Sequence, residues 1–156
     1  MKENIKIKGS FVLTLRDKDG NFKEERKEDN LIVNASLSEI TGLLGNVGAK
    51  TAFTYLAVGT GTTAANVADT TLEAEIVDSG LARASATVSQ QTTTVTEDTL
   101  RLQYGFTVTG TKAVTEIGAL NAASAGTLLG HQVFTALNVI DTDVLTFQYN
   151  FVFAGA

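Results

Sequence analysis

The chain of 156 residues contains no cysteine, no proline and no tryptophan, and it has one histidine, His131. The lack of cysteine excludes a disulfide framework, thiolate metal sites and cysteine nucleophiles. A single histidine excludes a zinc site built on a histidine pair and leaves no second imidazole for catalysis. The lack of proline removes one common guard on the edges of a β-sheet, which indicates edges paired with neighbouring subunits.

Positive charge and long apolar runs are also scarce. The 12 Lys and Arg residues are outnumbered by 17 Asp and Glu residues, which gives a formal net charge of −5. Because nucleic-acid binding depends on basic side chains that displace counterions, we expect no nucleic-acid partner. No stretch approaches the roughly 20 apolar residues that cross a bilayer, so we expect no membrane partner. The lysines near the N-terminus precede no apolar signal segment, so synthesis in the cytoplasm is expected.

The charge is unevenly distributed along the chain. Residues 1–30 carry 8 basic and 7 acidic residues, a net charge of +1. Residues 31–156 carry 4 basic and 10 acidic residues, a net charge of −6. The second part is rich in Thr, Ala and Gly. This composition suits either a surface that a partner covers or a polar sheet coated with threonine.

Apolar and polar residues alternate with a period of two in several segments, as in half-buried strands. The clearest of these are 5–15, 82–88, 100–108 and 145–153. A turn at 16–21 predicts a charged hairpin over about 5–28, because Asp-Gly tolerates positive φ. One short helix is predicted near 36–47, with Ser36 and Glu39 as a capping box. Its apolar positions are Leu37, Ile40, Leu43, Leu44 and Val47.

The spacing of these segments predicts the fold class. Strands recur every 8–15 residues, with one helix and no regular strand–helix alternation. This pattern predicts an all-β, antiparallel β-sandwich, of which a jelly roll is one form, in a single domain over 1–156. The segment at about 59–71 is predicted to be a long loop, and loops of this length are often functional. The pattern does not order the strands.

The sharpest motif is Gly59-Thr60-Gly61-Thr62-Thr63-Ala64, which follows a predicted strand and precedes Asp78 by about twenty residues. A dinucleotide site has this spacing, but it also needs a helix that begins at the glycines and then a parallel strand. Neither is predicted here, so we expect no nucleotide site. The turn Asp17–Asn21 lacks EF-hand spacing, and 141–143 is expected to be a second turn.

No catalytic constellation emerges from the remaining polar residues. His131 begins an apolar strand with no nucleophile or orienting acid marked beside it, so a surface or interface histidine is expected. Glu73 and Glu75 lie two residues apart without pocket-forming context, and solvation is their expected role. We therefore predict no catalytic, cofactor-binding or metal-binding residues, no cofactor, and no enzymatic activity.

Several short strings occur in an order that resembles small virion proteins of tailed bacteriophages. They are 7–13, 16–21, 30–35, 55–63, 69–75 with Arg83, 115–121 and 126–129. The resemblance implies a β-rich virion subunit made in the host cytoplasm, and it implies no catalytic residues. It also implies that the loop at 59–71 is an arm that lies on a neighbouring subunit.

Three functions remain open at this point. The first is a capsid decoration (cement) protein, expected as a homotrimer, that binds major capsid protein on the assembled head. The second is a tail, baseplate or fibre component bound to tail proteins. The third is a carbohydrate-binding or hydrolytic β-sandwich, which the aromatic content of 7% and the lack of tryptophan disfavour.

Overall fold

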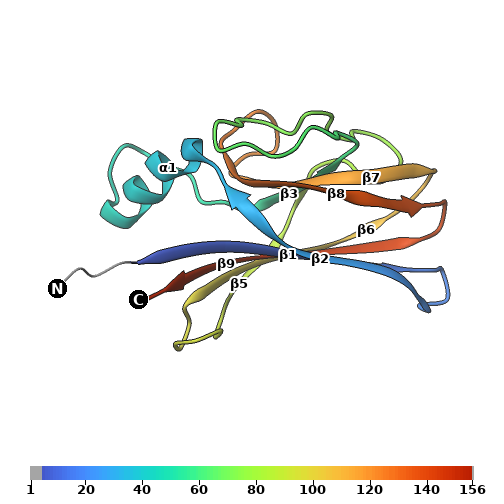
Figure 1. Cartoon of the computed structure of the whole chain (residues 1–156), viewed down its shortest axis with the longest axis horizontal. Helices are drawn as coiled ribbons and strands as arrows, with labels where there is room; N and C mark the ends of the chain where they lie inside the picture. The colour runs from blue at the N-terminus through green and yellow to red at the C-terminus, as the bar shows by residue number, and fades with distance from the viewer. Residues whose placement is uncertain (1–4, 156) are drawn as a thin grey trace.

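The computed structural model describes residues 5–155, which form nine strands and one helix. All of the strand pairs are antiparallel, so the predicted all-β fold with a single short helix is confirmed (Figure 1). The elements are β1 (Lys6–Arg16), β2 (Phe22–Ile32), α1 (Asn34–Gly45), β3 (Tyr55–Gly59), β4 (Ala84–Ser85), β5 (Thr87–Gln91), β6 (Thr99–Thr107), β7 (Lys112–Leu120), β8 (Leu128–Val139) and β9 (Val144–Ala154).

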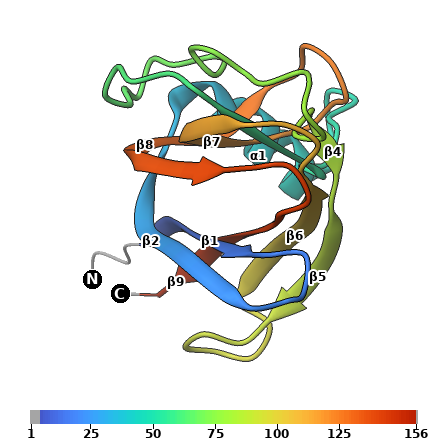
Figure 2. The ribbon, with the colours of Figure 1, turned by 90° about the vertical axis from the view of Figure 1, so that its right-hand side faces the viewer.

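The strands form two facing layers that are joined on both sides. Their order is β4-β3-β7-β8-β2-β1-β9-β6-β5. Strand β2 passes from one layer to the other, because it pairs with β1 as far as Asn30 and then with β8 through Leu31 and Ile32. On the other side β4 and β5 follow each other in the chain, and Ala86 between them donates its N–H to the Thr54 carbonyl at 2.7 Å. The sheet is therefore nearly closed (Figure 2).

The core lies between the layers and is built from the inward positions of the alternating strands. Strands β1 and β9 pair along their whole length, from Lys6 opposite Ala154 to Arg16 opposite Val144. Each fully buried apolar side chain contributes about 1.5–3 kcal/mol to stability. The alternation predicted over 145–153 places its inward residues in this core, whose central members are Phe11, Leu13, Leu15, Phe147, Tyr149 and Phe151.

The predicted hairpin is present, but its return strand is longer than expected. In the turn, the Gly20 N–H donates to the Asp17 carbonyl at 3.0 Å, and Gly20 has φ +84°. The return strand runs to Ile32 rather than ending at about residue 28. The short apolar segment after Asp29 is the continuation of this strand into the second layer, where both of its faces become partly buried.

The predicted capping box of the helix is wrong. The helix begins at Asn34 after Val33, and Ser36 lies inside its first turn with its Oγ donating to the Val33 carbonyl at 2.8 Å. The Glu39 carboxylate instead binds Lys50 Nζ and the Thr51 N–H, both at 3.3 Å. A long-range contact thus overrides the local capping pattern.

Only one residue of the predicted apolar stripe of α1 is buried. Ile40 is 8% exposed, whereas Leu44 is 77% exposed and Val47 is 63% exposed. Leu37 and Leu43 are also largely exposed. The reason is the position of the helix, which sits at one end of the two layers and not across the face of a sheet (Figure 1).

Candidate functional site

The long loop between β3 and β4 covers the outer face of the layer that contains β3, β7 and β8 (Figure 2). It spans 60–83, so it is longer than the predicted 59–71, and its one bridge joins Glu75 to Gly59. Leu72 of the loop packs in a small apolar cluster with Ala57, Leu120 and Leu128 of the sheet. The loop is therefore fastened to the sheet of its own chain.

The main polar anchor of this loop is Glu116, which is fully buried on β7. Its carboxylate accepts hydrogen bonds from three loop N–H groups, those of Gly61 at 3.0 Å, Glu73 at 3.0 Å and Ala74 at 2.7 Å. The neighbouring Thr115 donates its hydroxyl to the Gly61 carbonyl at 2.6 Å. Both ends of the loop segment 61–74 are thus bound to one strand.

His131 on β8 links Glu116 to a second point of the loop. Its Nε2 lies 2.9 Å from Glu116 Oε2, and its Nδ1 lies 2.8 Å from Asp69 Oδ2. The prediction was a surface or interface histidine, but the side chain is already buried in the isolated chain, at 3% exposed, so this prediction is wrong. The sequence interpretation also missed both carboxylates beside it. We call Asp69, Glu73, Glu116 and His131 the Glu116 cluster.

The charged forms of Glu116, Asp69 and His131 stabilise one another. Burial by itself raises the pKa of Glu116, but the bonds from His131 and the loop amides outweigh it and hold this pKa below its usual value. Burial by itself lowers the pKa of His131, but the bonds to Glu116 and Asp69 outweigh it and raise this pKa. For Asp69, burial is again outweighed, by the Asn66 N–H and His131, and its pKa is lowered. These shifts all favour the charged state of the cluster, in which an imidazolium lies between two carboxylates.

This arrangement holds the loop against the sheet. A polar cavity of about 330 Å³ opens beside it, lined by Thr63, Ala64, Ala68, Asp69, Thr70, Thr71, Glu73 and His131. Both ring nitrogens of His131 are bound to carboxylates, so as an imidazolium it donates both of its protons within the protein. Glu73 accepts hydrogen bonds from the N–H groups of Thr62 and Thr63, each at 2.8 Å. Its pKa is lowered by these bonds from Thr63 and Thr62.

The glycines of the Gly59–Ala64 motif are explained by Glu116 and not by a nucleotide. A Cβ atom on Gly59 would overlap the Glu116 carboxylate, and one on Gly61 would lie 2.6 Å from the Glu73 Cβ and 2.7 Å from Glu116 Cδ. Neither distance is sterically acceptable. The motif therefore provides the space in which the carboxylate meets the loop backbone.

The other acidic residues considered from the sequence lie apart from one another. Glu75 binds Arg83 through two hydrogen bonds, at 2.8 and 2.5 Å, whereas Glu73 binds Thr62 and Thr63. Asp78 pairs with Lys112 at 2.8 Å on the surface. Within residues 5–155, no group of three or more His, Asp or Glu side chains is arranged to hold a metal ion.

No protein-family model, curated protein or solved structure matches the chain. Among residues 5–155, no helix has the length and apolar character needed to span a bilayer.

The space that the glycines provide can be tested directly. We expect Gly59→Ala to lower the free energy of unfolding by about 1–3 kcal/mol, because the added methyl group overpacks the contact with Glu116. The measurement is urea unfolding followed by circular dichroism. Gly105→Ala is the matched control, since a Cβ atom there meets nothing within 4 Å. Equal stability of the two variants would contradict this role of Gly59.

Proposed function

We propose that the chain is a structural subunit of a tailed-bacteriophage virion, namely a capsid decoration protein that binds the outer face of the assembled head as a trimer. The resemblance of its sequence strings to small virion proteins supports this proposal. The Glu116 cluster supports it as well, because its charged groups are used to fasten a loop.

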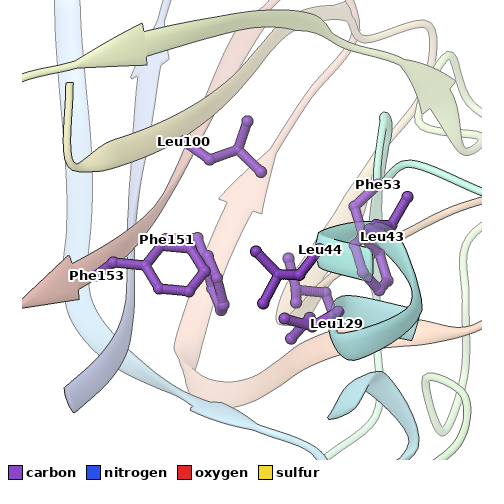
Figure 3. Close-up of a pocket in the computed structure, with 8 residues that line it drawn as sticks. Leu43, Leu44, Phe53, Leu100, Leu129, Phe151 and Phe153 are labelled. Carbon is purple, nitrogen blue, oxygen red and sulfur yellow. The ribbon is translucent and has the colours of Figure 1, made fainter. Parts of the chain in front are cut away.

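The observation that carries the proposal is the apolar end of the molecule at α1. Leu37, Leu43, Leu44 and Val47 are exposed there. Leu43 and Leu44 also line an apolar cavity of about 220 Å³ (Figure 3). The cavity is lined by Ile40, Leu43, Leu44, Phe53, Leu100, Leu129, Phe151 and Phe153. The only charge on α1, Glu39, is paired with Lys50. Exposed apolar surface beside an apolar cavity is typical of sites of protein association.

The location on a particle tests the proposal. Virions labelled with antibody against this protein and imaged in negative stain should carry label over the head lattice with local threefold symmetry. Label confined to the tail would replace decoration with the runner-up, a tail, baseplate or fibre component. Particles without label would refute both assignments.

The role of the α1 surface in assembly gives a second expectation. We expect Leu44→Glu to abolish binding of the purified protein to particles that lack it, because a carboxylate cannot enter an apolar contact without losing its hydration. Its free energy of unfolding should change by less than about 0.5 kcal/mol, since Leu44 is 77% exposed. The measurement is co-sedimentation with particles. Val95→Glu, at a site 62% exposed between β5 and β6, is the matched control and should bind normally.

A further inference from the structure

The first three residues of β1, Lys6–Lys8, are not paired with β2. The last paired residues of the two strands are Gly9 and Asn30, after which β2 moves to β8. Strand β1 continues to Lys6 and remains paired with β9 on its other side, with Lys6 opposite Ala154. Figure 1 shows β2 turning toward α1 while β1 continues toward the N-terminus. Among residues 5–155, no strand lies beside Lys6–Lys8 on the side that β2 leaves.

The separation leaves a cleft with an open strand edge as one wall. We call it the β1–β2 cleft; it has a volume of about 350 Å³ and is lined by Ile7, Lys8, Gly9, Asp29, Asn30, Leu31 and Ile32. Along a strand, the backbone N–H and C=O groups of successive residues point alternately to the two sides of the strand. The Lys6–Lys8 edge therefore presents backbone donors and acceptors to this cleft. Ile7, Leu31 and Ile32 are half-buried, which provides apolar contacts for a side chain.

One residue that lines the β1–β2 cleft, Asn30, has a buried side-chain amide whose oxygen makes no hydrogen bond with the rest of the described chain. Asn30 is 8% exposed, and its Nδ2 donates to the Tyr149 hydroxyl at 2.7 Å. Its Oδ1 lies 2.3 Å from the position that a Cβ atom on Gly9 would occupy, and it has no hydrogen-bond partner among the described residues. Buried acceptors are nearly always bonded. Because this oxygen has less than 1 Å² of exposed surface, a donor in the cleft reaches it only after the Asn30 side chain has moved.

The charge at the cleft selects the kind of segment that fits. Lys6 and Lys8 are exposed, lie on the same face of β1, and form no ion pair with any described residue. Asp29 is the only acid that lines the cleft. A second copy paired through the same edge would set lysines against lysines, which is unfavourable. An acidic strand would meet both lysines.

From the edge, the cleft and the two lysines, we propose that the β1–β2 cleft is a docking site for an extended acidic segment of a partner protein, which adds as a strand to the Lys6–Lys8 edge. This mode of recognition draws affinity from backbone hydrogen bonds and selectivity from side chains on alternate positions. It goes beyond the proposed function and does not depend on it, because it uses a different surface from α1.

The test uses the full chain and two synthetic hexapeptides, one alternating Thr with Glu and one alternating Thr with Lys. Titration of the ¹⁵N-labelled protein with the acidic peptide should shift the amide signals of 6–9 and 30–32 and slow hydrogen exchange at the Lys6–Lys8 edge. Lys6→Glu combined with Lys8→Glu should weaken the acidic peptide about tenfold and strengthen the basic one. Lys18→Glu combined with Lys112→Glu carries the same charge change elsewhere and should bind as the wild type does.

Four results would overturn the proposal. The first is equal binding of the acidic peptide to both double variants, and the second is a set of shifted amides outside 6–9 and 30–32. The third is slow exchange of every Lys6–Lys8 amide in the free, dilute monomer, because the chain's own residues would then fill the cleft. The fourth is slowing of the same amides as the protein concentration rises, because a second copy would then fill it. Thermal unfolding of both double variants checks that they remain folded.

Discussion

Replacement of Glu116 by glutamine should lower the free energy of unfolding by about 3–5 kcal/mol, the cost of removing one partner from a buried charge pair. The carboxylate accepts hydrogen bonds from His131 and from three loop N–H groups, those of Gly61, Glu73 and Ala74. A glutamine has the same shape, but one of its two polar atoms is a donor that would face other donors. The buried imidazolium would also lose its fully buried counter-charge.

Urea unfolding at neutral pH measures this loss, with Glu25→Gln as the matched control. Glu25 is exposed on β2 and its carboxylate makes no hydrogen bond or ion pair with the described residues, so its replacement should change stability by less than about 0.5 kcal/mol. Hydrogen exchange adds a local readout, because the amides of Gly61, Glu73 and Ala74 should exchange faster in Glu116→Gln than in the wild type. If Glu116→Gln proves as stable as Glu25→Gln, the cluster does not hold the loop.

The fold class was predictable because it depends on local patterns. Alternation in β1, β6 and β9 follows from burial of one face, and the turn at Asp17–Asn21 follows from the Asp-Gly pair. The strand order was not predictable, because it depends on the passage of β2 between the layers after Asn30. This passage leaves only a short apolar segment in the sequence. The capping box at Ser36 failed for a similar reason, since Glu39 is bound by Lys50.

The Glu116 cluster was not predicted, because its members are distant in the sequence. Asp69 lies 62 residues from His131, and Glu116 lies 15 residues from it. One signal was available: Glu116 is an acid inside the otherwise uncharged segment 113–120 of a buried strand. An ionised side chain in such a place requires partners. Together with the unexplained glycines at 59 and 61, it indicates a carboxylate bound by backbone amides.

The binding of loop 60–83 to its own sheet bears on the expectation that this segment is an arm. The resemblance implied that this segment lies on a neighbouring subunit, yet in the isolated chain its polar and apolar anchors are on its own sheet. Any contact of the loop with a neighbour would therefore be made by a surface already ordered before association. An ordered surface loses less conformational entropy on binding than a free arm does.

The dependence of stability on pH should follow the charge state of His131. Its pKa in the folded protein is raised above the ordinary 6.5 by the bonds to Glu116 and Asp69, which outweigh burial. The stabilisation is therefore complete below about pH 6.5 and is lost as the pH rises through the raised value. On the acid side, Asp69 and Glu116 have lowered pKa values, so their contribution is lost only as the pH falls through those values. Stability should be greatest between these limits.

Comparison of His131→Gln with the wild type isolates the pH-dependent stabilisation by His131, because both proteins contain the same other groups that titrate at high pH. We expect the variant to be less stable than the wild type by about 3–5 kcal/mol near pH 6, and we expect this difference to narrow as the pH rises through the raised pKa of His131. Urea unfolding at each pH measures this difference. Since His131 is the only histidine of the sequence, its ring proton signal in a chain without an added tag reports the pKa directly. A ring that titrates below 6.5, or a difference in stability that is constant with pH, would show that the imidazolium does not fasten the loop.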